Sequence, residues 1–325
     1  MSRRELTMSE AINEAVRHEM RRNSEIMLLG QDIGAYGGTF GVYRGIFDEF
    51  GEDRVKDGPL CEAATVGFGI GLALSGMPTI VEIEFFDFIT LASDALVNQA
   101  AKMRYFYGGQ VNVPLILRAP IVNRLSLGAQ HSQSLEAWMM HIPGLRVVIP
   151  SNGADAKGLL LTVMRENNPT LFIENVRLYA GKGAVSEEDD PIPLGKLRVA
   201  REGGDLSIAC YSGMVKPCLA AASVLEQEGI QCEVLDLRTL SPLDAEGICA
   251  SVRKTGRLVV AHEAVKTCGP GAEIAQVAME GAFDYLQAPI ARVASRDLPI
   301  PTGELQNAVF PDVDDVVQAA RTVMA

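Results

Sequence analysis

Apolar positions along this chain switch repeatedly between the period of a helix and that of a buried strand. Ile12, Val16 and Met20 recur every fourth residue, directly after Thr7 and Glu10, whose spacing is that of a capping box at a helix start. The short apolar run 26–29 follows and predicts a buried strand. Because this unit repeats with strands that are apolar on both faces, we predict a parallel sheet covered by helices on both sides.

Two such alternations divide the chain. In the first, helices are predicted over residues 8–21, 63–75, 89–107 and 153–166, and strands over 26–29, 79–85, 113–118, 145–149 and 170–174. The pattern lapses between residues 180 and 195, where a Gly-Lys-Gly run, four acidic residues and two prolines occur. It starts again at residue 206 and ends with a predicted helix over 313–324. We predict a first domain over 1–180, a linker over 181–194 and a smaller α/β domain over 195–325.

Composition narrows the range of functions. A net charge of -12 without a basic run argues against nucleic acid as a partner. The longest apolar stretches are well short of the ~20 residues that span a bilayer, and no apolar signal-peptide core follows the first residues, so a cytoplasmic location is expected. The six cysteines contain no C-x-x-C pair, which favours reduced, mostly buried thiols over a zinc site or disulfides.

Glu62 stands at the start of a helix rich in small residues. The glycines in Gly67-Phe68-Gly69-Ile70-Gly71 lack the third position of a dinucleotide fingerprint, so no such cofactor is predicted there. Gly67, Gly71 and Ser75 share one face, which another helix could approach closely. The carboxylate of Glu62 is open to two interpretations: a helix N-terminal charge favoured by the macrodipole, or a partly desolvated group suited to a specific hydrogen bond or proton transfer.

His131 is the histidine whose surroundings suggest chemistry. It lies in a polar loop, residues 128–133, beyond the strand that ends at Arg118, and open α/β sheets place ligands beyond the carboxyl ends of their strands. No Cys, Asp or Glu stands at metal-ligand spacing around it. The pattern therefore favours proton transfer over metal binding.

Five ordered segments resemble the signatures of one protein family. They are residues 57–62 (DGPLCE), 82–88 (EIEFFDF), 98–105 (NQAAKMRY), 130–133 (QHSQ) and 143–150 (PGLRVVIP). The family is that of the beta subunits of thiamine diphosphate-dependent 2-oxo acid dehydrogenases, and the likeness extends into the second domain at residues 233–238 and 262–264.

The resemblance implies a transketolase-like fold, with a pyrimidine-binding domain followed by a transketolase C-terminal domain. It makes Glu62 the carboxylate that hydrogen-bonds the aminopyrimidine ring of thiamine diphosphate, with Phe88 packing on that ring and Phe85 as a second aromatic group. The family's Gly-Asp-Gly signature for magnesium and diphosphate is missing here, and residues 203–206 do not match it. An alpha subunit would therefore bring the magnesium and the phosphate site.

The resemblance also assigns two further sets of residues. His131 matches the histidine that lines the substrate channel and acts in proton transfer during reductive acylation. A potassium ion held largely by backbone carbonyls is implied at Leu115, Val163, Met164, Glu166 and Asn168. Three residues depart from the usual pattern, Gly58, Cys61 and Gln31, and the loop 121–127 beside His131 is also unusual.

The function implied is oxidative decarboxylation of a 2-oxo acid, with pyruvate first, and acyl transfer to a lipoyl-bearing acyltransferase core. The active form would be a heterotetramer of two alpha and two beta subunits. The alternatives are the beta subunit of a branched-chain 2-oxo acid dehydrogenase, the beta subunit of an acetoin dehydrogenase, the C-terminal half of a split transketolase, and a non-catalytic docking subunit.

Overall fold

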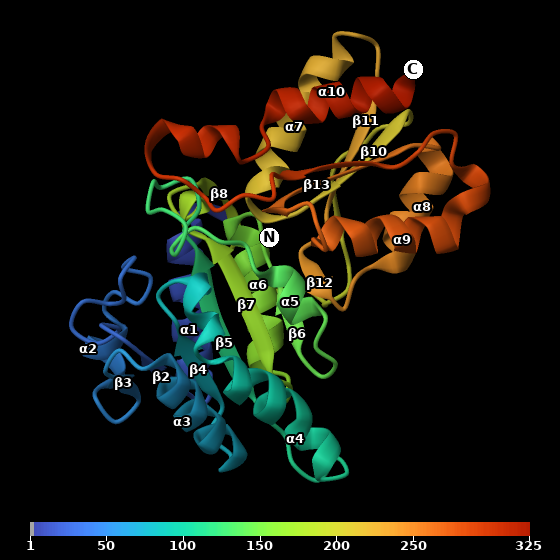
Figure 1. Ribbon diagram of the computed structural model, residues 1–325. Helices are drawn as coiled ribbons and strands as arrows, with labels where there is room; N and C mark the ends of the chain where they lie inside the picture. The colour runs from blue at the N-terminus through green and yellow to red at the C-terminus, as the bar shows by residue number, and fades with distance from the viewer. Residues whose placement is uncertain (1–2) are drawn as a thin grey trace. The chain divides into compact units, whose positions relative to one another are not determined.

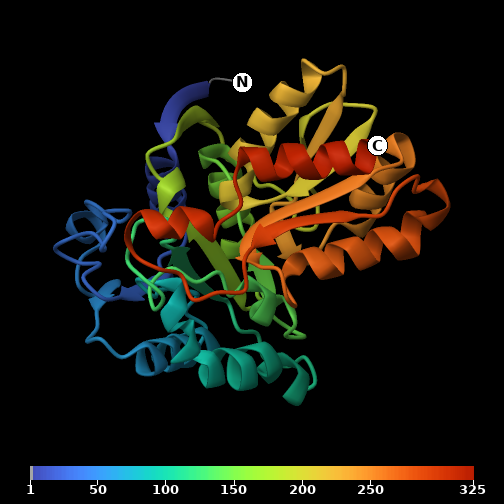
Figure 2. The same cartoon turned by 45° about the horizontal axis from the view of Figure 1, so that its top comes forward.

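The computed structural model describes residues 3–325, which form two compact units. The first unit comprises the residues up to 122 together with 138–194, and the second comprises 123–137 together with 195–325 (Figures 1 and 2). Segment 123–137 therefore folds with the second unit, whereas the sequence suggested two contiguous domains. Residues 1 and 2, which that division placed in the first domain, lie outside the described residues.

The first unit is built on a parallel sheet. Its strands are β1 (Arg3–Thr7), β2 (Met27–Gly30), β3 (Val55–Asp57), β4 (Thr79–Glu82), β5 (Leu115–Ile121), β6 (Arg146–Val148), β7 (Thr170–Asn175) and β8 (Lys182–Ser186). Its helices are α1 (Met8–Arg22), α2 (Ile46–Phe50), α3 (Glu62–Leu74), α4 (Ala101–Phe106) and α6 (Gly153–Met164), and α5 (Glu136–Met140) begins in segment 123–137. The parallel strands lie in the order β6-β7-β5-β4-β2-β3, and β1 pairs with β8 in an antiparallel ribbon.

Helices cover both faces of this sheet, as the apolar strands predict (Figure 1). Successive residues of a strand point to opposite faces. Ile80 and Ile116 pack into the core that α1 and α6 share, whereas Val81 lies against α3 at Gly69. A Cβ on Gly69 would stand 2.6 Å from the Val81 side chain, so this glycine is what lets α3 approach the sheet closely.

The structure confirms the predicted start of the first helix and differs from the helix predicted over 89–107. At α1 the Thr7 hydroxyl accepts from the Glu10 N–H at 3.2 Å and the Glu10 carboxylate accepts from the Thr7 N–H at 2.8 Å, which confirms the capping box. The single helix predicted over 89–107 is only partly confirmed, because a continuous helical stretch covers 93–106 but is not α-helical throughout. The chain instead forms a 3-10 turn (Phe86–Thr90), a π-helix (Ala95–Ala100) and then α4. Ala100 and Ala101, where the π-helix passes into α4, are both buried.

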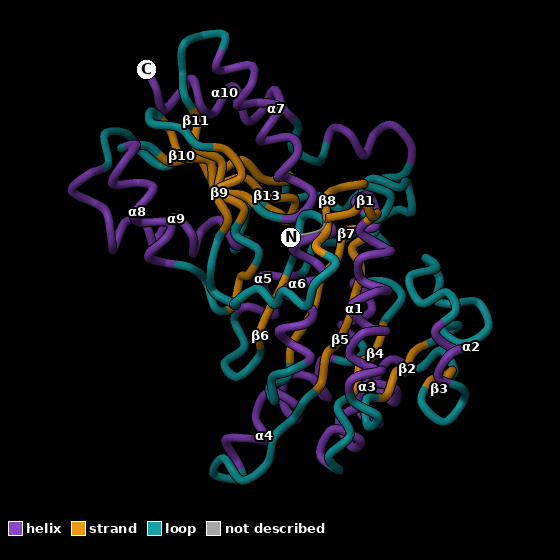
Figure 3. The backbone as a smooth tube through the Cα atoms, turned by 180° about the vertical axis from the view of Figure 1, so that it is seen from behind, coloured by secondary structure: helices purple, strands orange, loops and turns teal. Residues whose placement is uncertain are grey.

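The second unit repeats the α/β plan around a smaller sheet. Its strands are β9 (Arg198–Arg201), β10 (Leu206–Cys210), β11 (Cys232–Asp236), β12 (Thr239–Ser241), β13 (Leu258–Val265) and β14 (Ala291–Ser295). Its helices are α7 (Val215–Glu226), α8 (Ala245–Thr255), α9 (Pro270–Ala282) and α10 (Val313–Met324). In the sheet order β14-β13-β10-β11-β9 only β9 runs antiparallel. Helices α7 and α10 pack on one face (Figure 3).

No helix in the described residues 3–325 is long and apolar enough to cross a membrane. The cysteines are free, and four of the six are buried, in agreement with the prediction of reduced, mostly buried thiols.

The first unit buries one charged network at the carboxyl ends of its central strands. Arg118 of β5 is fully buried and donates from Nη1 to Glu82 of β4 at 2.6 Å and from Nε to Glu174 of β7 at 2.6 Å. Its guanidinium also lies over the Tyr43 ring, with Cζ 4.8 Å from the ring centroid. Two buried carboxylates thus share one cation, and removing that cation would leave both charges without compensation.

The surplus of acidic groups affects the protonation of Glu82. Burial raises the pKa of Glu82 to about 7, and the neighbouring charges of Glu174 and Glu84 act in the same direction against the attraction of Arg118. A carboxyl group with a raised pKa holds its proton in the folded chain at pH values where the unfolded chain has lost it. Its contribution to stability is therefore complete below the ordinary pKa of a glutamate and is lost as the pH rises towards 7.

We predict that Glu82→Gln flattens the pH dependence of stability between pH 5 and 7. A single proton retained on folding changes the free energy of unfolding by up to about 1.4 kcal/mol per pH unit. Urea unfolding of the full chain at several pH values measures this slope, with the exposed Glu52→Gln as the control. Equal slopes in the wild type and the Glu82→Gln variant would contradict the raised pKa.

Candidate functional site

Glu62 is the first residue of α3 and lies half-buried in a depression of the first unit. The loop before it is fixed to the end of β2, because the Gly58 N–H donates to the Gly30 carbonyl at 2.9 Å. The lining of the depression comes from the ends of β2 and β4 and from the start of α3: Gln31, Pro59, Cys61, Glu62, Thr65, Glu82, Ile83 and Glu84. The predicted carboxylate therefore lies beyond the carboxyl ends of parallel strands, where such sheets bind ligands.

Acidic groups dominate this depression. Glu62, Glu82 and Glu84 all line it, and no Lys or Arg does. Glu84 in turn accepts a hydrogen bond from the hydroxyl of Thr39, which lies in a loop between Gly38 and Gly41. A site with this lining can accept hydrogen bonds from a ring or stabilise a positive charge, but it is unsuited to a diphosphate, which needs cationic or metal partners.

Aromatic side chains follow β4 directly. The rings of Phe85 and Phe88 meet edge to face with centroids 5.9 Å apart, and Phe40 packs against Phe85 in the same manner at 6.0 Å. Phe85 and Phe88 are each half-buried. Edge-to-face pairs of this kind hold their rings in fixed orientations and leave ring surface for a flat, apolar group to pack on.

The fit to thiamine diphosphate is therefore partial. A carboxylate beside half-buried aromatic rings suits the aminopyrimidine end of the cofactor. No group of three or more His, Cys, Asp and Glu residues in the described part of the chain is arranged to hold a metal ion. The residues of the depression fit the pyrimidine and do not fit the diphosphate with its magnesium.

His131 lies in segment 123–137 and so belongs to the second unit, while Glu62 belongs to the first. It is half-buried in a loop without helix or strand, and its backbone N–H donates to the Gly128 carbonyl at 3.3 Å. The structure thus places the two predicted catalytic side chains on different units of the chain.

The residues predicted to hold potassium gather near the carboxyl end of α6. Val163 and Met164 are in its last turn, Glu166 and Asn168 follow in the turn before β7, and Leu115 begins β5. Val163, Met164 and Glu166 line one small pocket. The last carbonyls of a helix lack partners within the helix and carry its negative dipole end, so they suit a cation. The Glu166 carboxylate is paired with Arg146.

A buried polar cluster in the second unit was not found from the sequence. Tyr211, which follows β10, donates its hydroxyl to Glu136 at 2.9 Å, and its ring stacks on His262 of β13 with centroids 6.2 Å apart. Burial raises the pKa of Glu136 to about 7 and lowers that of His262 to about 4. Glu136 and Tyr211 are separated by 75 residues, so no local pattern could have linked them.

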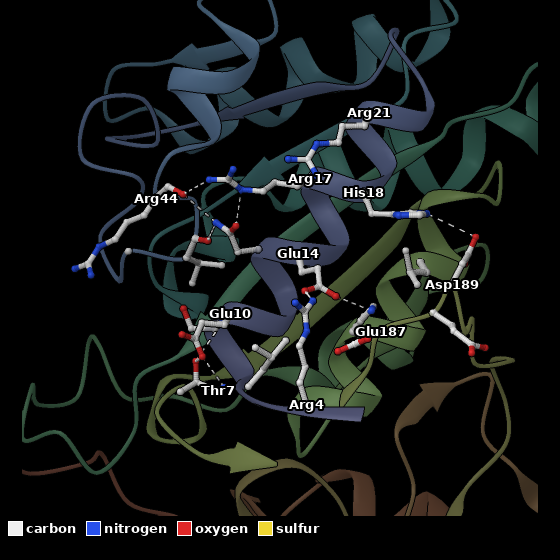
Figure 4. Close-up of a pocket in the computed structure, with 18 residues that line it drawn as sticks. Arg4, Thr7, Glu10, Glu14, Arg17, His18, Arg21, Arg44, Glu187 and Asp189 are labelled. Atoms are coloured by element: carbon white, nitrogen blue, oxygen red, sulfur yellow. Dashed lines mark hydrogen bonds and ion pairs between the residues drawn. The ribbon is translucent and has the colours of Figure 1, made fainter. Parts of the chain in front are cut away.

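A larger hollow of the first unit lies elsewhere, along α1 (Figure 4). Several of its charged groups are in ion pairs: Arg4 with Glu14, His18 with Asp189 at 3.6 Å, and Arg17 with Glu49 of α2 at 2.6 Å. None of the residues predicted to be functional lines it. The hollow is best explained as a solvated groove between paired charges.

Comparison with known proteins agrees with the two halves of this architecture. The family model described as "Transketolase, pyrimidine binding domain" matches residues 4–182, and "Transketolase, C-terminal domain" matches 195–316. Among solved structures, "Split gene transketolase, inactive beta4 tetramer" has a TM-score of 0.81 at 23% identity and covers 98% of each chain, which shows the fold.

Proteins of similar sequence identify the family more narrowly than the fold does. The pyruvate dehydrogenase E1 component subunit beta of Bacillus subtilis is 42% identical over 321 residues, covering 98% of this chain and 99% of its own. The mitochondrial subunit beta-1 of Oryza sativa is also 42% identical over 323 residues, covering 98% of this chain and 86% of its own. The chain therefore belongs to the family of pyruvate dehydrogenase E1 component beta subunits.

Proposed function

We propose that this chain is the beta subunit of a thiamine diphosphate-dependent component that decarboxylates pyruvate and passes the acyl group to lipoyl groups of an acyltransferase. One observation supports the proposal: Glu62 stands at the start of α3 in an acidic depression without Lys or Arg, and half-buried aromatic residues follow in the chain directly after Glu84, which lines that depression. Such a site can exchange a proton with a cofactor ring, but it lacks the cationic groups that bind phosphates, so another chain would bind them.

Each site residue has a defined task in this proposal. Glu62 accepts a hydrogen bond from a protonated nitrogen of the aminopyrimidine and exchanges that proton with it. Phe88, supported by Phe85, packs on the ring and excludes water from the bond to Glu62, which strengthens it. The bound cofactor supplies the nucleophilic carbon that a 2-oxo acid needs to lose its carboxylate. His131 transfers a proton when the acyl group passes to the lipoyl sulfur.

The relatives favour pyruvate as the substrate. Each alternative enzyme retains the same cofactor, so the depression around Glu62 does not distinguish pyruvate from a branched-chain 2-oxo acid or acetoin. Identities of 42% with pyruvate dehydrogenase subunits over almost the whole chain favour the first. The split transketolase is 23% identical, so that comparison supports the shared fold and no shared reaction. The cytoplasmic location remains a prediction from the sequence.

We expect Glu62→Gln to lower turnover of pyruvate by at least about a hundredfold, since proton transfer by a positioned carboxylate contributes about 10²–10⁴-fold to a rate. The assay uses the chain reconstituted with its alpha subunit, saturating thiamine diphosphate and magnesium, and an artificial electron acceptor. The matched control is Glu52→Gln, an exposed carboxylate of the same unit that should leave turnover unchanged. If Glu62→Gln retained wild-type turnover, the catalytic role of Glu62 would have to be given up.

The proposed alpha partner would cover large apolar side chains that are exposed on α3, on α4 and in the loop before α3. Leu60 next to the Glu62 loop is 68% exposed, Phe68 of α3 is 57% exposed and Tyr105 of α4 is 84% exposed. Exposed apolar groups that gather near a site mark surfaces that another chain covers. We propose that an alpha subunit brings magnesium and the diphosphate site, and that two chains of each kind assemble.

Native mass spectrometry of the co-expressed subunits should give the mass of two alpha and two beta chains. Phe68→Asp places a charge on the surface proposed to be covered and should reduce the assembled fraction at least tenfold. Val224→Asp, at a position of α7 that is 43% exposed, is the control and should assemble normally. Equal assembly of both variants would contradict a partner on the α3 surface.

We also propose that the carbonyls near the end of α6 bind potassium. At equal ionic strength, the full chain should melt several degrees higher in potassium chloride than in choline chloride, because an ion that binds the folded state stabilises it. Asn168→Ala keeps the backbone carbonyl and should keep this difference. The same melting temperature in both salts would contradict a potassium site.

A further inference from the structure

The loop that carries His131 is held to its own unit at both ends. On the amino side, Arg124 donates from Nε to Glu263 of β13 at 3.0 Å and from Nη2 to the Pro311 carbonyl. Its guanidinium also lies over the buried Phe310 ring, with Cζ 4.8 Å from the centroid. This one side chain thus joins the loop to two separate stretches of the second unit.

Ser126 adds a second contact at the same end. Its backbone N–H donates to the side-chain oxygen of Gln306 at 3.0 Å, while its hydroxyl accepts from the Gly303 N–H. Both Gly303 and Gln306 belong to the 3-10 turn Gly303–Ala308. The loop before His131 is therefore fixed by backbone and side-chain hydrogen bonds as well as by an ion pair.

The backbone of this end is strained. Arg124 has φ +58° and Ser126 has φ +65°, values in the left-handed region that side chains other than glycine rarely adopt. A conformation of this kind persists only where surrounding contacts hold it, and such strain gathers at functional sites. The contacts of Arg124 and Ser126 are the ones in place to hold it.

The carboxyl side of the loop ends at Glu136, which is 1% exposed. Its Oε1 accepts from the Tyr211 hydroxyl at 2.9 Å, and Tyr211 is fixed in turn by stacking on the buried His262. His131 lies between this anchor and the one at Arg124. Apolar side chains of the loop are left exposed, with Leu125 at 43% and Leu127 at 45%, so they contribute little packing that could replace the anchors.

We propose that Arg124 and Glu136 are positioning residues that hold His131 in place for acyl transfer. The inference rests on the proposed function of His131 and adds the means by which the second unit fixes it. Because both anchors lie in the second unit and Glu62 lies in the first, loosening the loop should impair the step that uses His131 and spare the step that uses Glu62.

The test compares two activities of the reconstituted enzyme. Arg124→Ala should lower lipoyl-dependent turnover tenfold or more, while decarboxylation measured with an artificial electron acceptor stays within twofold of the wild type. Arg124→Lys keeps the charge opposite Glu263 but cannot donate to Glu263 and to the Pro311 carbonyl at the same time with a planar guanidinium. Its lipoyl-dependent turnover should therefore be intermediate. A proportional loss of both activities, or a loss of neither, would overturn the proposal.

A matched control exists in the same unit. Arg253 of α8 also pairs with a carboxylate, Glu246 at 2.7 Å, and donates to a backbone carbonyl, that of Gly281, at 2.9 Å. Arg253→Ala should leave both activities unchanged. At the other anchor, Glu136→Ala should reproduce the effect of Arg124→Ala, whereas Glu136→Gln should retain activity because the amide oxygen still accepts from Tyr211.

Hydrogen exchange separates a failure of this inference from a failure of the proposed function. In the full chain without partner or cofactor, Arg124→Ala should speed amide exchange across residues 125–135 at least tenfold, and Arg253→Ala should not. Unchanged exchange would show that Arg124 does not hold the loop, whatever the reaction. Faster exchange with both activities intact would show that the loop is held there but that His131 does not depend on it.

Discussion

Parallel pairing of the central strands is the constraint on which the first unit depends. Because β2, β4, β5 and β7 run in the same direction, their carboxyl ends meet at one edge, and the residues that follow them converge there. Gln31, Glu82 and Glu84 line one depression with Glu62 in this way, and the Phe85–Phe88 pair follows the same end of β4. The buried Arg118 ties three of these strand ends together through Glu82 and Glu174.

Elements with strong local patterns could be predicted from the sequence. The capping box of α1, the apolar strands and the small-residue helix α3 are each encoded within a few neighbouring residues, and the structure contains them. Glu62 could be singled out for the same reason, since it opens that helix. The role of Glu62, by contrast, came from the family resemblance and is still a proposal.

Features that depend on distant residues could not be predicted. The segment around His131 folds with the second unit because Arg124 reaches Glu263 and Pro311, and Glu136 reaches Tyr211. The helix expected over 89–107 instead consists of a 3-10 turn and, from residue 93, a helix that contains a π segment, and the apolar period of the sequence carries no sign of the wider π turn. Neither outcome has a signal within a short window of sequence.

By the function proposed above, the chain provides the pyrimidine-binding half of a thiamine diphosphate site, and a different chain binds the phosphates. Isothermal titration of thiamine diphosphate and magnesium into the isolated full-length chain tests it most directly. We expect the isolated chain to show no measurable binding of thiamine diphosphate at micromolar concentrations of the cofactor. Tight, magnesium-dependent binding by the chain alone would contradict it.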